Sequence, residues 1–280
     1  NYKFIKCNIN DPKLKKIIFK YKPKVIFNLA AETHVDRSID KPDNFVESNI
    51  LGVYNLLKCF KDFSKRNKSK LIHISTDEVY GDIIKGRTSE NFPYNPSSPY
   101  AATKASAELL VNSYVKTYDL DCVITRCTNN YGPRQFYEKL IPKTIFLANH
   151  DKKIPIYGTG KNIRDWIFVD DHCEAVYNVL LNGKSGESYN ISSNNELDNI
   201  TIVKTILEIM DKSEDLIEFV DDRPGHDLRY SLDSSKIRKS LKWAEKITFQ
   251  EGLEKTIEWY LKSDDQSITK ESLNSTPWKN

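Results

Sequence analysis

The sequence contains no apolar run that approaches the about 18 residues of a membrane span, and its cysteines follow no pattern. Their number is odd and no Cys-x-x-Cys occurs, which favours thiols packed as small hydrophobic side chains. The five are Cys7, Cys59, Cys122, Cys127 and Cys173. We therefore expect reduced thiols, a cytoplasmic location and no membrane partner.

Histidine clusters and blocks of positive charge are also missing. The five histidines are dispersed and form no His-x-x-x-His pair, so no metal site is predicted. Lysine and arginine number 42 against 39 acidic residues, and they are scattered instead of forming the basic stripe of a nucleic-acid-binding protein. No nucleic-acid partner is expected, and the small net charge of +3 suits an anionic ligand such as a diphosphate.

The first thirty residues predict a strand, a helix and a second strand. Residues 2–5 read as a strand, Pro12 opens a helix to about Lys20, and residues 23–30 form the next apolar strand. Such alternation is typical of an α/β fold with a parallel sheet. Because 280 residues exceed the usual single domain, a smaller appended domain is expected.

A polar motif follows the apolar strand predicted at residues 71–74. Ser75, Thr76, Asp77 and Glu78 come directly after it, at the carboxyl end of a strand, where open α/β sheets bind ligands. Adjacent carboxylates repel, so the pKa of one should rise, and the pair could then supply an acid and a base. An isolated pair of this kind is more often a helix cap beside a solvated side chain.

A second motif, Tyr100-x-x-x-Lys104, favours the functional interpretation of the first. Pro99 suits the first turn of a helix, and the run from Ala101 to Val111 favours its continuation. Tyr100 and Lys104 then lie one turn apart on one face, and a neighbouring ammonium lowers the pKa of a phenol toward that of a general base. The spacing alone is common on surface helices. After a strand that ends in Ser-Thr-Asp-Glu, it predicts an active site.

Six segments resemble the extended short-chain dehydrogenase/reductase family, and within it the nucleotide-sugar 4,6-dehydratases that act on dTDP-glucose or UDP-glucose. They follow the family's order along the whole chain. The segments are residues 28–38 (NLAAETHVDRS), 75–81 (STDEVYG), 100–104 (YAATK), 129–133 (NNYGP), 164–166 (RDW) and 222–227 (DRPGHD). The resemblance implies a Rossmann-type, doubly wound parallel sheet with a smaller α/β substrate-binding domain.

The resemblance also implies a reaction with internally recycled NAD. The implied catalytic residues are Thr76, Asp77, Glu78, Tyr100 and Lys104. Tyr100 would take the proton of the sugar's 4-hydroxyl while hydride passes to NAD, and Thr76 would bond the same oxygen. Glu78 would remove the proton on carbon 5, and Asp77 would protonate the departing 6-hydroxyl. Hydride then returns to carbon 6, which gives a 4-keto-6-deoxy sugar nucleotide.

Contacts to NAD are implied at the ends of the first strands and around the tyrosine. They are Asn8, Ile9, Leu29, Ala30, Ala31, Thr33, Ser48, Tyr100, Lys104 and Asn130. The family has an acidic residue before the aliphatic one where this chain has Asn8-Ile9. An amide can still meet the edge of adenine, and a simple turn residue is an equally weighted alternative.

Contacts to the sugar nucleotide are implied from residue 33 to residue 226. They are Thr33, Thr76, Asn129, Glu138, Lys139, Leu140, Pro155, Tyr157, Arg164, Asn199, Arg223 and His226. Arg164 is the expected diphosphate clamp, because a planar guanidinium grips phosphate oxygens in two places. A structural pair with Asp165 is the alternative. Asn199 is expected to cap a helix from Ile200 to Met210.

One part of the family pattern does not occur in the sequence. Family members begin with a strand, a Gly-x-x-Gly-x-x-Gly turn and a helix that seat the dinucleotide pyrophosphate, whereas residue 1 already corresponds to their third strand. We expect the chain to be incomplete by roughly 50 to 60 residues. The NAD-binding domain, N-terminally incomplete, is predicted at residues 1–126 and 164–192, and the nucleotide-sugar-binding domain at residues 127–163 and 193–280.

Two other functions remain open at this stage. A 4-epimerase of the same family needs only the Tyr-Lys pair and a hydroxyl residue, so Asp77 and Glu78 favour the dehydratase. A catalytically inactive sugar-nucleotide-binding protein would be distinguished by its NAD content. Nothing in the sequence separates dTDP-glucose from UDP-glucose. The resemblance implies a homodimer, since family members pair through helices that include the one bearing Tyr100.

Overall fold

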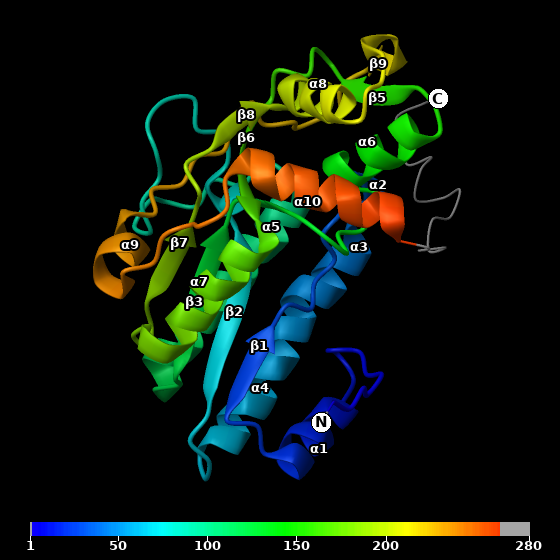
Figure 1. The fold of residues 1–280 in the computed structure, drawn as a ribbon. Helices are drawn as coiled ribbons and strands as arrows, with labels where there is room; N and C mark the ends of the chain where they lie inside the picture. Colours follow the sequence, from blue (N-terminus) through cyan, green and yellow to red (C-terminus); the bar gives the residue numbers. More distant parts are fainter. Residues whose placement is uncertain (1, 264–280) are drawn as a thin grey trace.

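The computed structural model describes residues 2–263, and its centre is a four-stranded sheet (Figure 1). The strand order is β1-β2-β3-β7, and every neighbouring pair is parallel. The strands are β1 (Val25–Asn28), β2 (Lys70–Thr76), β3 (Cys122–Cys127) and β7 (Ser188–Ile191). Parallel strands place their carboxyl ends on one edge of the sheet, which is where the polar motif after β2 lies.

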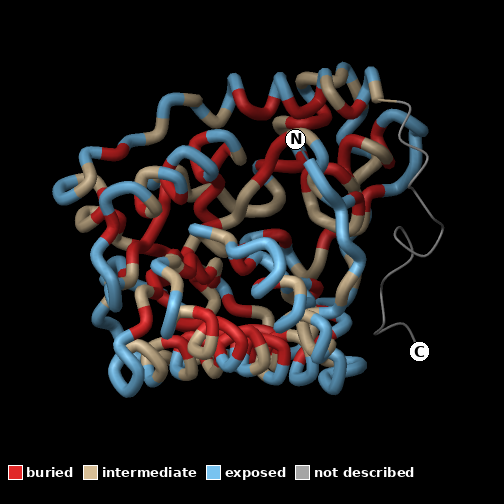
Figure 2. Tube along the Cα trace, turned by 90° about the horizontal axis from the view of Figure 1, so that it is seen from below, coloured by how far each residue is buried: buried red, intermediate tan, exposed pale blue. Residues whose placement is uncertain are grey.

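Helices cover both faces of this sheet, because successive side chains of a strand point to opposite sides. Leu71 and Ile124 pack with α1, α4 and α5, whereas Ile72 and Val123 pack with α7 and α9. The helices are α1 (Lys13–Tyr21), α4 (Gly52–Ser64), α5 (Pro99–Tyr118), α7 (Val169–Asn182) and α9 (Ser235–Leu241). Figure 2 shows the buried positions enclosed by exposed ones. The expected doubly wound α/β sheet is confirmed.

Smaller elements lie beyond the carboxyl ends of the central strands (Figure 1). A three-stranded sheet in the order β4-β6-β8 and a two-stranded sheet of β5 and β9 pack with three helices. The elements are β4 (Asn129–Tyr131), β5 (Ile154–Tyr157), β6 (Ile163–Phe168), β8 (Glu196–Asp198), β9 (Ile217–Val220), α6 (Leu140–Asn149), α8 (Asn199–Ile209) and α10 (Phe249–Lys262). The predicted domain boundaries stay a prediction.

The connection between β1 and β2 is mostly helical and contains a π-helical turn. It runs through α2 (Val35–Asp40), α3 (Pro42–Phe45) and η1 (Val46–Leu51) into α4. Asn49 in η1 is buried; its amide nitrogen donates to the Glu32 carbonyl and to the Thr103 hydroxyl, both at 3.0 Å. The Glu32 N–H returns a bond to the Asn49 side chain at 2.8 Å. The π-helical turn thereby fixes the segment after β1 against α5.

Two local predictions are wrong. Residues 2–5 form no strand, and Phe4 is 73% exposed; a strand needs a neighbour for its hydrogen bonds, and no described strand pairs with them. Asn199 is the first residue of α8 and not its cap, because the Asp198 carboxylate accepts the bond from the Thr201 N–H at 2.9 Å. Residues 264–280, which the predicted sugar-nucleotide domain includes, lie outside the described residues.

Residues 2–263 contain no helix that is both long and apolar enough to span a bilayer. They also contain no group of three or more histidine, cysteine or acidic side chains arranged to hold a metal ion. All five cysteines are free thiols.

Candidate active site

The polar motif after β2 forms a 3-10 turn, η2 (Asp77–Tyr80), at the carboxyl end of the central sheet. The Thr76 hydroxyl accepts a hydrogen bond from the Glu78 N–H (3.3 Å) and donates one to an Asp77 carboxylate oxygen (3.0 Å). Asp77 is 3% exposed, and its other carboxylate oxygen has no partner among residues 2–263. A buried charge without compensation is costly, so this carboxyl group favours its protonated form.

Tyr100 and Lys104 reach the same place from α5. The helix begins with a proline in its first turn, as predicted, and both side chains are buried. Tyr100 is hydrogen-bonded to Thr76 and close enough to both acids of the motif for their charges to act on it. The Lys104 ammonium donates to the Ile74 carbonyl in β2 at 2.6 Å. The structure therefore brings the five predicted catalytic residues together, and their roles stay predictions.

Burial controls the ionisation of the two acids. It raises the pKa of Asp77 to about 8, and the neighbouring Glu78 carboxylate adds to the rise. Burial also raises the pKa of Glu78, which the Arg223 and Arg164 guanidinium groups partly offset. The prediction of a raised pKa within the pair is confirmed. At neutral pH, Asp77 holds a proton that it can donate.

The predicted lowering of the Tyr100 pKa is wrong for the described chain. Burial raises this pKa well above its usual value, and the negative charge of the Glu78 carboxylate raises it further. Lys104 does not offset them: its ammonium is bound to the Ile74 carbonyl, and burial lowers its own pKa to about 8. Helical spacing places a phenol and an ammonium on one face, but it carries no information on burial.

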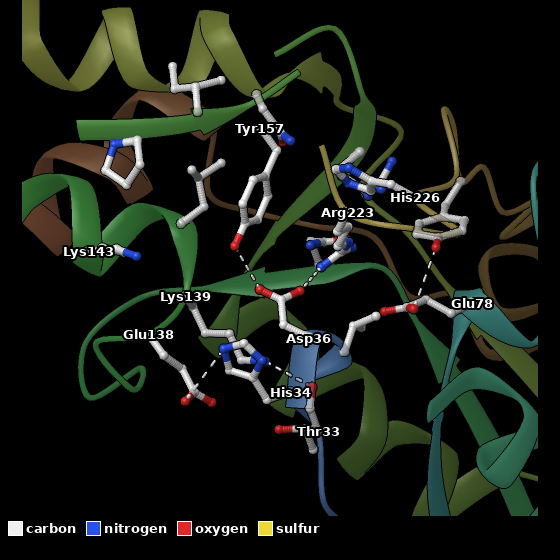
Figure 3. A pocket seen from close by; sticks show the side chains of 18 of the residues that line it. Thr33, His34, Asp36, Glu78, Glu138, Lys139, Lys143, Tyr157, Arg223 and His226 are labelled. Atoms are coloured by element: carbon white, nitrogen blue, oxygen red, sulfur yellow. Dashed lines mark hydrogen bonds and ion pairs between the residues drawn. The ribbon is translucent and has the colours of Figure 1, made fainter. Parts of the chain in front are cut away.

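A cavity of about 210 Å³ begins at Glu78 and extends between α2, α6 and β5 (Figure 3). Every predicted substrate contact except Thr76 lines it. These residues are Thr33, Asn129, Glu138, Lys139, Leu140, Pro155, Tyr157, Arg164, Asn199, Arg223 and His226. Thr76 is buried in the adjoining turn. The shared cavity links these distant segments to the catalytic motif, and each contact with a substrate stays a prediction.

Asp36, which the sequence analysis did not single out, joins two of these residues. Its carboxylate accepts hydrogen bonds from the Arg223 guanidinium (2.6 Å) and from the Tyr157 hydroxyl (2.9 Å) (Figure 3). Asp36 is 4% exposed and lies on α2, 187 positions before Arg223. It stands inside the segment at residues 28–38 that carries the resemblance, but no local pattern reveals so distant a partner.

The other cations of the cavity are partly held by backbone carbonyls. Lys139 donates to the Thr33 carbonyl at 3.0 Å. The Arg164 guanidinium donates to the Asp227 carbonyl at 3.0 Å and lies 4.2 Å from the centre of the Tyr230 ring. The alternative pairing of Arg164 with its neighbouring aspartate is wrong, because Asp165 accepts bonds from the turn that follows β7. The role of Arg164 as a diphosphate clamp stays a prediction.

Lys143, Trp166 and Tyr230 also line the cavity, and the sequence analysis missed them. Lys143 follows Lys139 by one turn of α6, so helical spacing was an available signal. The Tyr230 hydroxyl donates to the Asp227 carboxylate at 2.8 Å and lies 3.5 Å from the Glu78 carboxylate. Tyr230 therefore contacts a predicted catalytic residue from outside every recognised motif.

The residues next to the catalytic motif fit a nicotinamide. Asn130 is held through its amide nitrogen by the Thr128 carbonyl (3.2 Å) and the Cys127 sulfur (3.3 Å), while its buried side-chain oxygen has no partner within residues 2–263. A carboxamide N–H would satisfy that oxygen. Leu29 and Ala30 are exposed just beyond the end of β1, and Leu29 is 66% exposed. Such apolar side chains suit the packing of a planar ring.

The predicted contacts at the adenine end are less distinctive. The Asn8 side chain accepts a bond from the Asn10 N–H at 2.9 Å, which favours its alternative role as a turn residue. Ile9 packs into the core beneath α4, and Ser48 is half-buried in η1. A glycine-rich strand-turn-helix does not occur within residues 2–263. The described residues thus fit the nicotinamide end of a dinucleotide, and their contacts stay predictions.

Known proteins resemble the chain along most of its length. Residues 1–256 match the family model described as GDP-mannose 4,6 dehydratase. A dTDP-glucose 4,6-dehydratase of Haemophilus influenzae is 46% identical over 95% of this chain and 85% of its own length. That of Neisseria meningitidis is 44% identical over 98% and 82%.

A solved structure agrees with both relatives. The dTDP-glucose 4,6-dehydratase of Streptomyces venezuelae, crystallised with NAD, superimposes with a TM-score of 0.88 at 40% identity and covers 92% of this chain and 79% of that one. The fold, the order of the motifs and the agreement in sequence converge on one assignment. The chain belongs to the extended short-chain dehydrogenase/reductase family, among its nucleotide-sugar 4,6-dehydratases.

Proposed function

We propose that the protein is an NAD-dependent hydro-lyase that converts dTDP-glucose into its 4-keto-6-deoxy derivative and water. The observation that carries this proposal is that Asp77 and Tyr100 meet at the Thr76 hydroxyl, directly beside Glu78, which lines one end of the cavity. The relatives named above support dTDP-glucose over UDP-glucose. Bound NAD supplies a hydride acceptor at carbon 4 of the sugar and a hydride donor at carbon 6.

In this mechanism the chain moves three protons. Tyr100 must start as a phenolate, which the positive charge of the oxidised nicotinamide ring would favour against the burial that raises its pKa. It then takes the proton of the 4-hydroxyl, and the Thr76 hydroxyl hydrogen-bonds the same oxygen. The 4-ketone makes the hydrogen on carbon 5 acidic, and Glu78 removes it; a raised pKa makes Glu78 a stronger base. Asp77, protonated below about pH 8, gives its proton to the departing 6-hydroxyl, which leaves as water. Glu78 then returns its proton to carbon 5.

The hydrogen bonds of Thr76 suggest how the site resets. The Thr76 hydroxyl donates a hydrogen bond to Asp77 and is also hydrogen-bonded to Tyr100. The proton that Tyr100 has gained can therefore pass through the Thr76 hydroxyl to the carboxylate that Asp77 has become. After this transfer both side chains regain their starting states, and the protons balance over one turnover.

A 4-epimerase of the same family would not need this arrangement. Epimerisation requires hydride removal and return at one carbon, which the tyrosine and a hydroxyl residue can serve. Neither Asp77 nor Glu78 would then have a proton to move, although the cost of burying two adjacent carboxyl groups would remain. We therefore place the epimerase behind the dehydratase.

An assay with each glucose nucleotide tests the proposal. The protein, with its bound NAD quantified, is mixed with dTDP-glucose or UDP-glucose, and the alkaline absorbance of a 4-keto product is followed. We expect product from dTDP-glucose, and none from a Glu78→Gln variant that still contains NAD. Release of a 4-epimer without any keto product, or full dehydration by the variant, would contradict the assignment.

We further propose that the protein is a cytoplasmic homodimer. The adjacent helices α4 and α5 expose Tyr54 (42%), Leu109 (56%) and Tyr118 (46%), which a second copy would cover. Five free thiols suit a reducing compartment. Light scattering at micromolar concentration should give twice the chain mass, and a monomer would contradict the pairing. Cell fractionation tests the location.

A further inference from the structure

Lys143 places a cation in the sugar-nucleotide cavity that the proposed mechanism does not use. It lies on α6 one turn after Lys139 and lines the cavity. Its side chain is half-buried, and among residues 2–263 it has neither a side-chain hydrogen bond nor an ion pair within 4.0 Å. The carboxylates whose charge acts on it are those of Asp36 and Glu138. Each of these already has another cation.

The order of side chains along the cavity shows which part of a ligand Lys143 would meet. Glu78 lies at one end of the cavity and Lys143 at the opposite end (Figure 3). Between them, Arg223 is closer to Glu78 and Tyr157 is closer to Lys143. A sugar with its reacting carbons at Glu78 would direct its diphosphate past Arg223. The base would then lie beside Tyr157 and Lys143.

The chemistry of that end suits a planar base with a polar edge. Pro155, Ile156 and Tyr157 of β5 provide apolar and aromatic surface there. The Tyr157 hydroxyl already donates to Asp36, and Lys143 adds three N–H donors and no acceptor. A pyrimidine with ring carbonyl oxygens offers acceptors at its edge for such donors, whereas adenine offers only ring nitrogens, in a larger two-ring outline.

We propose that Lys143 recognises the base of the nucleotide by donating a hydrogen bond to a ring carbonyl oxygen of thymine. This inference rests on the proposed function for the orientation of the ligand. It makes Lys143 a specificity-determining residue and leaves the diphosphate to Arg223 and Arg164. A charged donor on a neutral acceptor in a half-buried site changes affinity by roughly tenfold to a hundredfold.

Direct binding of dTDP and ADP to the parent protein and three variants tests this assignment by calorimetry, without turnover. Lys143→Met keeps the length of the side chain and removes every donor, whereas Lys143→Gln keeps an N–H donor without charge. Lys116→Met, an exposed position on α5, is the matched control. All are tested with NAD bound.

We expect Lys143→Met to weaken the binding of dTDP at least tenfold and the binding of ADP less than threefold. Lys143→Gln should recover part of the affinity for dTDP. The control variant should bind both nucleotides like the parent protein. Equal weakening of dTDP and ADP would assign Lys143 to the phosphates and overturn the proposal. A loss below threefold for dTDP, or no recovery by Lys143→Gln, would overturn it as well. If the parent protein binds dTDP but does not dehydrate dTDP-glucose, the proposed function fails while this test still stands.

Discussion

Replacing Asp77 with asparagine should stabilise the folded chain at high pH while it removes activity. Burial and the Glu78 carboxylate raise the Asp77 pKa from 3.8 to about 8. Between these values the folded chain keeps a proton that the unfolded chain releases, so the free energy of unfolding falls as the pH rises. Roughly four pKa steps at about 1.4 kcal/mol each amount to roughly 6 kcal/mol. Asparagine carries no such proton and avoids this loss.

Urea unfolding at two pH values measures the effect. The variant should exceed the parent in unfolding free energy at both, and the difference should grow by roughly 3 kcal/mol between about pH 5.5 and pH 8. Asp43→Asn, at an exposed position on α3, is the matched control and should show no growth. A constant difference between the Asp77 variant and the parent would refute the argument that burial raises this pKa.

The same substitution tests the catalytic role of Asp77. Loss of a general acid should lower kcat by about 100- to 10,000-fold. In the parent protein, kcat should fall as the pH rises through about 8, where Asp77 loses the proton that it must donate. A variant with normal kcat, or a parent rate that stays flat through that range, would remove Asp77 from the mechanism.

Three further substitutions test other parts of the structure. The Arg126 guanidinium lies 2.6 Å from the Glu108 carboxylate and is 2% exposed. Because Glu108→Ala removes this charge partner, the free energy of unfolding, measured by thermal unfolding, should fall by about 3–5 kcal/mol; a fall below about 1 kcal/mol would contradict this. Asp36→Asn removes the charge that orients Arg223 and should raise KM for dTDP-glucose about tenfold with kcat nearly unchanged; an unchanged KM would show that the pair is not needed. Gly252→Ala would put a Cβ too close to the buried Tyr131 hydroxyl. The free energy of unfolding in urea should therefore fall by about 1–3 kcal/mol, and an unchanged stability would contradict this.

The sequence predicts most accurately where local pattern and motif agree. The β2 strand followed by Ser-Thr-Asp-Glu, and α5 with Tyr100 in its first turn, occur as expected. Both depend on neighbours within one or two turns, which a single sequence displays in full. The resemblance then supplied what local pattern cannot, namely that residues from Thr33 to His226 share one cavity.

The failures concern burial and distant partners. The Tyr100 pKa moves opposite to the prediction because desolvation outweighs a lysine one turn away. Residues 2–5 have the composition of a strand, but pairing decides whether a strand forms. Asp36 was missed because its partners follow it by more than a hundred residues. Burial, strand pairing and contacts between distant residues cannot be read from the spacing of residues along the chain.

The contact between Asp36 and Arg223 also concerns how the protein is made. At 5–20 residues per second, roughly 10–40 s separate the synthesis of these two residues on a ribosome. During that interval the α2 carboxylate has no guanidinium to face and must remain hydrated. The nascent chain can complete its central sheet with β7, but the cavity closes only when residue 223 has emerged. Ribosome-bound chains halted before and after residue 223 leaves the exit tunnel should therefore differ in nucleotide binding.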